Sequence, residues 1–315
     1  MITVTLNPSL DRTLDVEGLE VGEVNRAVGT HLDAGGKGIN VSRGLHQHGL
    51  PTVAVFPLGG PDGQVLASEL AASGVPVRPV PIAGSTRSNI TIADSRGITT
   101  KINAPGAALS AAELDAVCDA VAEELDRGAR GVVAAGSLPD GVPSTILTRL
   151  ARLAAERGVP YAVDTSGAPL AEAVAAGGLA VVKPNDDELA ELVGRELSTV
   201  GDVLEAAREV LAPGNDAVLV SLGAHGALLV TDAGSWWAGG PRLVAVSTVG
   251  AGDSTLAGWL AAERSPAPER LRTAVAWGRA AVLLPGTEMP RPEHLDLASV
   301  RVVHEPDPAR ALKEL

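Results

Sequence analysis

Aromatic residues and cysteine are both scarce in this sequence. Aromatic side chains make up 2% of the 315 residues, so valine, leucine and alanine must fill the interior. The lone cysteine, Cys118, excludes an intramolecular disulfide and any multi-cysteine zinc site. It lies in a helical apolar pattern, which favours a buried small side chain over a reactive thiol.

The sequence also has little that would direct it to a membrane or out of the cell. The first six residues, MITVTL, resemble a strand, with no basic segment and no long apolar run. We therefore expect neither a signal peptide nor a membrane span, and a cytoplasmic protein. The six histidines offer no metal motif, because His46 and His48 would point to different faces of a helix.

Basic residues are outnumbered, with 25 lysines and arginines against 38 acidic residues and a formal net charge of −13. A nucleic-acid partner usually needs a basic face, so we expect none. The hydrophobic content of 45% is ordinary for a globular protein. On such an acidic protein, any site for an anionic substrate would have to be locally positive.

Short runs rich in valine, isoleucine and alanine alternate with segments of helical periodicity. One such helix is indicated by apolar residues between Leu114 and Leu125, and Ser110 with Glu113 forms a capping box at its start. The alternation predicts an α/β fold, a doubly wound and mostly parallel sheet flanked by helices. The strand-like runs lie around residues 1–6, 52–57, 131–135, 160–164, 179–183, 216–221 and 226–231.

Two segments break this alternation. Residues 12–33 are polar and strand-like without a helix, and residues 85–103 alternate around a turn at 94–97, which predicts an antiparallel hairpin. Together they predict a small second sheet, a β-sheet lid that could exclude water from a reaction beside it. No linker interrupts the chain, so we expect a single domain over residues 1–315.

Residues 247–254 (STVGAGDS) carry the strongest local signal. They follow the apolar run 243–246 and precede a helical pattern, which predicts a strand-to-helix turn. Its glycines let backbone N–H groups converge on an anion at a helix N-terminus. Asp253 could then accept a hydroxyl proton during attack on a γ-phosphate. Alternatively, Asp253 only caps its helix, and the spacing leaves both interpretations open.

Residues 35–40 (GGKGIN) are a second glycine-rich turn. They lack the GxxxxGK[ST] spacing of a P-loop, and neither they nor residues 250–252 complete a GxGxxG fingerprint. A P-loop nucleotidase and a nicotinamide dehydrogenase therefore both lose support. The turn could be purely structural, although Lys37, Asn40 and open amides would suit a sugar phosphate.

Two further turns could contact a nucleotide or metal ion. Residues 183–188 (KPNDDE) end a strand and begin a helix, where Asn185 and Glu188 could help to hold Mg²⁺, partly through water. The acidic residues could equally serve the helix dipole alone. Residues 221–226 (SLGAHG) could be a glycine-rich hairpin or a bend around a nucleotide.

In this order, the motifs resemble the phosphofructokinase-B family of ribokinase-like sugar kinases. The resemblance covers nearly the whole chain, from residues 5–11 to the glycine region near Gly278. It includes residues 35–40, 136–139, 183–188 and 248–253. Within the family, the sequence is similar to the 1-phosphofructokinase and tagatose-6-phosphate kinase branch, through residues 7–11, 22–26, 86–89 and 164–167.

The resemblance implies transfer of a phosphoryl group from ATP, with Mg²⁺, to a hydroxymethyl group of a ketohexose phosphate. Fructose 1-phosphate, giving fructose 1,6-bisphosphate, is the first expectation, followed by tagatose 6-phosphate and fructose 6-phosphate. Asp253 would be the base beside an anion hole of Gly250, Ala251 and Gly252. The residues implied for the sugar are Asp11, Gly36, Lys37 and Asn40, with Arg87 and Ser137 for its phosphate. Those implied for ATP are Lys183, Asn185, Ser221, Gly223, Gly226, Thr248 and Gly278, with Asn185 and Glu188 for the metal.

Convergence of Lys37, Arg87 and Lys183 with Mg²⁺ would supply the positive charge that the anionic substrates need.

Two residues depart from the branch: Lys101, which could alter the preferred sugar phosphate, and His225 in the nucleotide loop. A non-catalytic sugar-phosphate-sensing module is the alternative of another class, and the intact anion hole argues against it. Exposed lid strands also favour a homodimer.

Overall fold

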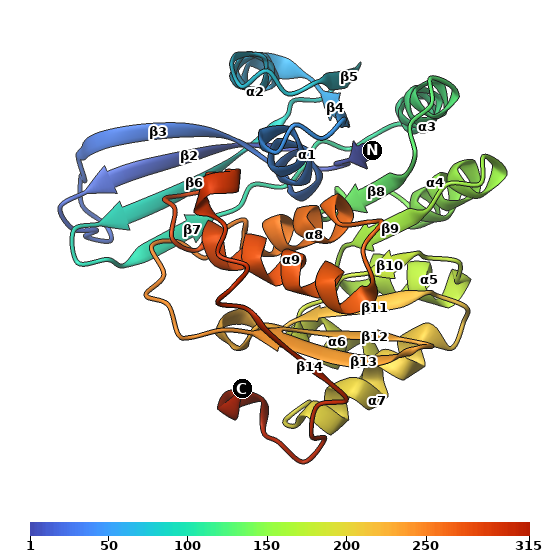
Figure 1. Ribbon diagram of the computed structural model, residues 1–315. Helices are drawn as coiled ribbons and strands as arrows, with labels where there is room; N and C mark the ends of the chain where they lie inside the picture. Colours follow the sequence, from blue (N-terminus) through green and yellow to red (C-terminus); the bar gives the residue numbers. More distant parts are fainter.

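The computed structural model describes residues 1–315 as a large sheet between two layers of helices, with a smaller sheet projecting to one side (Figure 1). The large sheet has the strand order β14-β13-β12-β11-β10-β9-β8-β1-β4-β5. Its strands are β1 (Ile2–Val4), β4 (Val53–Leu58), β5 (Val77–Pro81), β8 (Val132–Ala135), β9 (Tyr161–Asp164), β10 (Val181–Val182), β11 (Ala217–Ser221), β12 (Ala227–Thr231), β13 (Gly234–Gly239) and β14 (Arg301–His304).

From β5 to β11 neighbouring strands run parallel, whereas β11 to β14 pair antiparallel. The strand order changes direction at β1, which lies between β4 and β8. Ligands of such sheets bind outside the carboxyl ends of the strands near a change of this kind. The predicted doubly wound α/β fold is confirmed.

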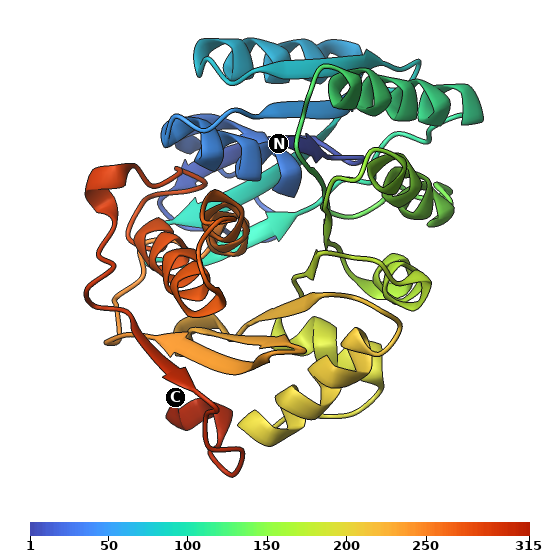
Figure 2. The ribbon, with the colours of Figure 1, turned by 45° about the vertical axis from the view of Figure 1, so that its right-hand side comes forward.

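The helices cover both faces of the sheet because successive strand residues point to opposite sides. In β8, Val132 packs with one helix layer and Val133 with the other. Figure 2 shows the two layers on opposite sides of the strands. One contains α3 (Ala111–Asp126), α4 (Thr145–Glu156), α5 (Gly167–Ala176), α6 (Asp186–Val193) and α7 (Val200–Leu211). The other contains α1 (Lys37–Gln47), α8 (Ala251–Ala261) and α9 (Ala267–Ala281), with α2 (Gly60–Ala72) beside α1.

Local signals account for several of these boundaries. Ser110 and Glu113 form the predicted capping box at the start of α3, and Cys118 is buried in that helix. No helix is both long enough and apolar enough to cross a membrane. Three short 3₁₀ helices complete the elements: η1 (Gly223–His225), η2 (Pro292–His294) and η3 (Leu312–Glu314).

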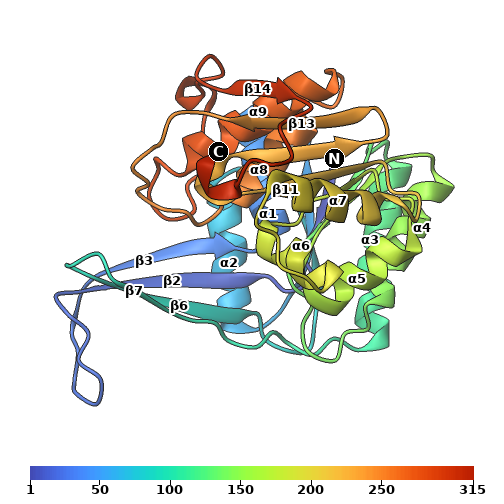
Figure 3. The same cartoon turned by 90° about the horizontal axis from the view of Figure 1, so that it is seen from below.

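The smaller sheet, which we call the lid, contains β2 (Ser9–Val16), β3 (Ala27–Gly35), β6 (Arg87–Asp94) and β7 (Thr99–Ile102). Its order is β3-β2-β6-β7, and β6 with β7 forms the predicted antiparallel hairpin. Figure 3 shows the lid extending away from the α/β body. The predicted small sheet is therefore confirmed, while the single domain over 1–315 stays a prediction.

The apolar run 243–246 is not the strand that the sequence predicts. It lies in an irregular segment between β13 and α8, and Val244 is 91% exposed. The sheet position beside β13 is taken by β14, so the run has no strand with which to pair. The sequence-based interpretation also omitted β5, β13 and β14, of which β5 and β14 are the two edges of the sheet.

Candidate active site

A cavity of about 730 Å³ lies at the carboxyl ends of the parallel strands, beside the base of the lid. Asp164 ends β9, Lys183 directly follows β10, and Ser221 ends β11. All the site residues predicted from the sequence line this cavity: Asp11, Gly36, Lys37, Asn40, Arg87, Ser137, Lys183, Asn185, Glu188, Ser221, Gly223, Gly226, Thr248, Gly250, Ala251, Gly252, Asp253 and Gly278. Their individual roles stay predictions.

The N-terminus of α8 provides free backbone donors at the centre of the cavity. Gly250, the N-cap, has φ +78°, a left-handed conformation that favours glycine. The N–H of Ser254 donates to Gly250 O at 2.8 Å, but the N–H groups of Gly252 and Asp253 have no acceptor within the protein. Unpaired amides at a helix N-terminus attract anions. The turn therefore offers the free backbone N–H groups that the sequence predicts, although a loop rather than a strand precedes it.

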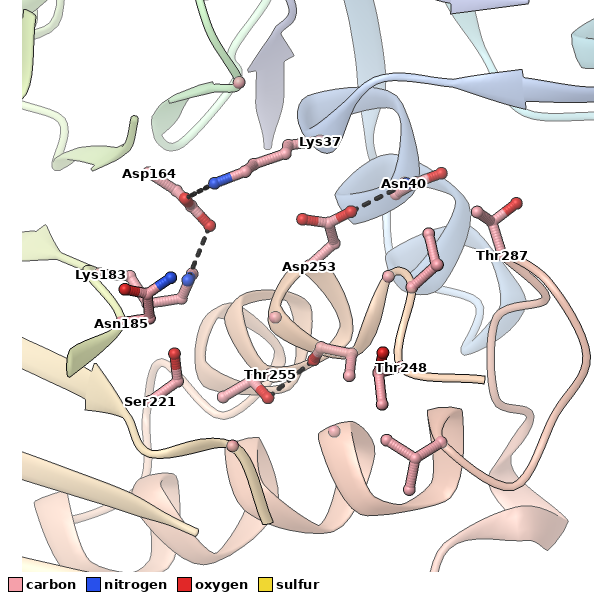
Figure 4. A pocket seen from close by; sticks show the side chains of 18 of the residues that line it. Lys37, Asn40, Asp164, Lys183, Asn185, Ser221, Thr248, Asp253, Thr255 and Thr287 are labelled. Atoms are coloured by element: carbon pink, nitrogen blue, oxygen red, sulfur yellow. Dashed lines mark hydrogen bonds and ion pairs between the residues drawn. The ribbon is translucent and has the colours of Figure 1, made fainter. Parts of the chain in front are cut away.

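Asp253 lies in the first turn of α8 and is only 7% exposed. Its Oδ2 accepts a hydrogen bond from Asn40 Nδ2 at 2.8 Å, while Oδ1 has no hydrogen-bond partner (Figure 4). Burial, and then the negative charge of Asp164, raise the pKa of Asp253 to about 6. A carboxylate with one anchored and one free oxygen can accept a proton from a bound hydroxyl group.

A buried carboxylate joins two lysines on the opposite side of the cavity. Asp164 is 1% exposed, and its two oxygens lie 2.6 Å from Lys37 Nζ and 2.9 Å from Lys183 Nζ (Figure 4). Burial opposes ionisation of Asp164, but the two lysines outweigh it and lower its pKa. Burial likewise opposes the charge of Lys37, but Asp164 raises the pKa of that lysine. Lys37 is therefore charged, and Asp164 fixes the direction of both lysine side chains.

Asp164 was not among the predicted site residues. Its signal was present, because an aspartate that directly follows the apolar residues 161–163 must lie at the end of a buried strand. That its partners would be two lysines from distant parts of the chain could not be read from the sequence.

The cavity is less positive than expected. Its cationic side chains are Lys37, Arg87, Lys183 and Arg279, and its carboxylates are Asp11, Asp164, Asp186, Glu188 and Asp253. The lysines and Arg87 do line one cavity, but the side chains alone do not make it positive. A bound polyphosphate would therefore need an additional cation to balance its charge.

Asn185 and Glu188 begin α6 as a reciprocal capping box. Asn185 Oδ1 accepts the N–H of Glu188 at 2.7 Å, and Glu188 Oε2 accepts the N–H of Asn185 at 2.9 Å. The other oxygen of Glu188, Oε1, lies 3.8 Å from Lys37 Nζ. Magnesium in kinases is commonly held by one or two carboxylates together with substrate phosphates. Glu188 fits such a site, and Asn185 retains one lone pair for it.

The base of the lid presents a polar face to the cavity. Strand pairing places Ser9 opposite Arg87 and Asp11 opposite Asn89, and all four line the cavity. Asn89 Nδ2 donates to Asp11 Oδ1 at 2.9 Å. Ser9 and Asn89 were missed from the sequence, although the two-residue period of a strand puts each on the same face as a predicted residue.

Arg87 is held at this face by the backbone. Its Nη atoms donate to Ala104 O at 3.1 Å and Asn7 O at 3.3 Å, and Asn7 Nδ2 donates to Ser137 Oγ at 3.2 Å. The Nε of Arg87 and the Oδ1 of Asn89 are buried without a partner. Both atoms belong to residues that line the cavity.

Part of the cavity wall is apolar. Five small or aliphatic side chains contribute to it: Leu243, Ala245, Val249, Val275 and Val282. The run 243–246 that was predicted as a strand thus contributes to the cavity wall. A surface of this kind suits the flat ring of a nucleotide base.

Two of the predicted nucleotide-site glycines also have a packing role. A Cβ atom at Gly278 would lie 2.2 Å from Thr255 Oγ1, and one at Gly226 would lie 2.0 Å from Ala238 O. Neither position can therefore take a larger residue without a shift of its neighbours.

Lys101 is exposed on β7 and does not line the cavity. His225 does not line it either, and its carbonyl accepts a hydrogen bond from Trp237 Nε1. Neither departure from the family pattern therefore reaches the cavity.

Unpaired amides at a helix N-terminus, a buried carboxylate and paired lysines suit phosphoryl transfer to a hydroxyl group, the chemistry of small-molecule kinases. Comparison with known proteins agrees, because the pfkB family carbohydrate kinase profile matches residues 4–294. The chain belongs to the pfkB family of carbohydrate kinases, whose phosphoryl donor is ATP. This membership rejects the dehydrogenase alternative.

Individual relatives cover most of the chain. It is 38% identical to a 1-phosphofructokinase of Rhodobacter capsulatus over 93% of both chains. It is 39% identical to the ATP-dependent 6-phosphofructokinase isozyme 2 of Escherichia coli, over 91% of this chain and 94% of that one. The crystal structure of Escherichia coli phosphofructokinase-2 in complex with potassium superposes with a TM-score of 0.88, at 36% identity, covering 93% of this chain and 96% of that one.

Proposed function

We propose that this protein transfers the γ-phosphoryl group of ATP to the free hydroxymethyl group of a ketohexose phosphate, with fructose 1-phosphate as the preferred acceptor. The observation that carries the proposal is Asp253, whose free Oδ1 lies beside the unpaired amides of the α8 N-terminus. The similarity to proteins named 1-phosphofructokinase supports the choice of acceptor.

In the proposed reaction, Asp253 Oδ1 accepts the proton of the hydroxymethyl group as its oxygen attacks the γ-phosphorus. A new P–O bond forms to the sugar, and the bond between the γ-phosphorus and the leaving oxygen of ADP breaks. The free amides of Gly252 and Asp253 stabilise the charge on the transferring group, and Lys183 lies next to Gly252. Bound Mg²⁺, held through Glu188 and Asn185, would supply charge neutralisation for the phosphates of ATP.

Two parts of the cavity wall suit the two substrates. At the lid base, Arg87 and Ser137 would bind the phosphate already on the sugar, and Asp11 with Asn89 would bind its hydroxyl groups. The apolar part of the wall, which includes Val249 and Val275, would receive the adenine of ATP. Asp253 belongs to neither part, and the transferred phosphoryl group would pass to the sugar beside it.

Fructose 6-phosphate is the second candidate acceptor, because relatives named 6-phosphofructokinase isozyme 2 are about as similar to the chain, at 38% and 39% identity. Tagatose 6-phosphate stays a third. A panel of these phosphosugars and free fructose, assayed with MgATP by coupled ADP release, tests the assignment. The highest kcat/KM with fructose 1-phosphate supports it, and a higher value with fructose 6-phosphate reassigns the acceptor. Binding without turnover of any of them would favour the sensing module.

We also propose a homodimer formed through the lid, in the cytoplasm where ATP is available. Val21, Val24, Val28, Ile98 and Ile102 are all more than half exposed on the lid, and β3 and β7 are its free edges. Light scattering of the parent and of Val28→Glu tests the dimer. A monomeric parent would contradict it. A solved structure of Escherichia coli phosphofructokinase-2 is described as a tetrameric inhibited form, so larger assemblies are a further outcome.

A further inference from the structure

The first turns of α1 form a row of polar side chains that ends at Arg43. Lys37, Asn40 and Arg43 are spaced three residues apart, so they lie on one face of the helix. Lys37 and Asn40 line the cavity, whereas Arg43 lies behind Asn40 and does not. Arg43 was not singled out by any sequence motif.

Both polar atoms of the Asn40 side chain already have partners. Nδ2 donates to Asp253 Oδ2 at 2.8 Å, and Oδ1 accepts from Arg43 Nη1 at 3.2 Å (Figure 4 shows the contact with Asp253). The two contacts define the orientation of the amide. A guanidinium can only donate and an ionised carboxylate can only accept, so the oxygen must face Arg43 and the NH₂ group must face Asp253.

The remaining contacts of Arg43 are also with neutral oxygens. Nη1 lies 3.4 Å from Ala34 O, at the end of β3, and 3.3 Å from Thr287 Oγ1, in the segment that follows α9. No carboxylate lies within ion-pair distance of this partly buried guanidinium. Burial lowers the pKa of Arg43, and the nearby charges of Asp33, Glu288 and Asp11 offset that effect only in part. A role beyond packing would account for an arginine held at this cost.

We propose that Arg43 is a positioning residue for phosphoryl transfer, which fixes the Asn40 amide so that it anchors Asp253 Oδ2 and leaves Oδ1 free for the substrate proton. This inference rests on the proposed role of Asp253 as the base. Arg43 touches neither substrate, and it acts only through Asn40. Without Arg43, the Asn40 amide can turn its oxygen toward Asp253, which disfavours the carboxylate and favours its protonated form.

The test uses Arg43→Met, which keeps much of the side-chain volume but removes the donor. We expect kcat to fall about 10- to 100-fold at pH 7, the size of a hydrogen bond to a charged group, with the KM for ATP nearly unchanged. The acidic limb of the pH profile of kcat/KM should move to higher pH. Asp164, Lys37 and Lys183 also act on Asp253, but Arg43→Met leaves their contacts in place.

A double-mutant cycle with Asn40→Ala separates positioning from a merely structural role. If Arg43 acts through Asn40, Arg43→Met should cost little more in the Asn40→Ala background. Arg149→Met is the matched control, because Arg149 forms a surface ion pair with Asp115 far from the cavity, and its kinetics should equal the parent's. Full additivity of the two changes, or an unmoved acidic limb, would overturn the proposal.

If Arg43→Met does not fold, the same cycle is run with Arg43→Lys, whose single ammonium group can reach fewer of the three acceptors. We expect an intermediate shift of the acidic limb, and no shift would overturn the proposal. The base assignment is tested apart from this one. Full activity of Asp253→Asn would remove the proposed base, whereas an inactive Asp253→Asn with an unaffected Arg43→Met would overturn only the role of Arg43.

Discussion

Burial of Asp253 sets the pH range in which it can act as a base. Its pKa is raised to about 6, chiefly by burial and next by Asp164. A base must be deprotonated, so kcat/KM should decline about tenfold per pH unit below pH 6 and level off above pH 7. The second ionisation of a sugar phosphate falls near the same pH, so the residual activity of Asp253→Asn is the control. An identical acidic limb in that variant would show that the substrate, not Asp253, titrates.

The same burial predicts an effect on stability. Because the folded-state pKa of this acid lies above its unfolded value, the folded protein binds the proton more tightly, and the free energy of unfolding falls as pH rises from about 4 to 6. Asp253→Asn removes the buried charge. We expect it to raise the free energy of unfolding at pH 8 by up to about 3 kcal/mol, and by about half as much at pH 5. Urea titrations at both pH values measure this, and a destabilised variant at pH 8 would contradict it.

Arg87 distinguishes a phosphosugar kinase from a kinase of free sugars. Arg87→Ala should raise the KM for the phosphosugar about ten- to a thousandfold and hardly change the KM for ATP, because a charge-assisted pair with the phosphate is lost. Arg87→Lys should recover only part, since lysine cannot form two parallel hydrogen bonds. Arg12→Ala is the matched control, because Arg12 lies on the same lid sheet but not in the cavity. An unchanged KM for the phosphosugar would reject the phosphate-binding role.

At the scale of elements, the N-terminus of α8 concentrates the proposed chemistry in one helical turn. A Cβ atom at Gly252 would lie 3.5 Å from Lys183 Nζ, an ordinary contact, so the fold has room for a side chain there. Gly252→Val should therefore fold but block the approach of phosphate to the amides, with turnover largely lost. Circular dichroism checks the fold and coupled ADP release the turnover. Full activity would mean that the anion-binding donors lie elsewhere.

The sequence predicted the elements whose signals are local. Glycine turns at residues 35–40 and 250–252, and the hairpin around 94–97, were all recognisable because glycine and alternation specify turns within a few residues. The run 243–246 was misread as a strand, since an apolar stretch has the same appearance whether it enters a sheet or lines a cavity. Strand β14 was missed because half of its side chains are exposed.

At the scale of the whole molecule, the pairing of charged residues from distant parts of the chain could not be predicted from the sequence. Lys37 and Asp164 are 127 residues apart, and only the winding of the sheet brings them to 2.6 Å. The family resemblance supplied the kinase prediction, which family membership confirms, and it supplied most of the site residues that line the cavity. It included Asp164 and Asn89 only as markers of the branch, with no role in the site, and it did not include Arg43. The contacts of all three depend on the assembled strands and helices.

The fold brings three cationic side chains from distant parts of the chain to the place where phosphate groups are proposed to bind. Lys37 and Lys183 reach the cavity from a helix start and a strand end, and Arg87 reaches it from the lid. Asp253 lies among these groups with an amide anchor on one oxygen and no partner on the other. The central claim is that this carboxylate is the base of the kinase.

Single-turnover transfer from MgATP to fructose 1-phosphate by Asp253→Asn tests this claim most directly. Asparagine keeps the size of the side chain and can still accept the hydrogen bond from Asn40, but it cannot take a proton. We expect a rate about 10²- to 10⁴-fold below the parent's, with ATP affinity nearly unchanged. A rate within about threefold of the parent's would show that Asp253 only caps its helix.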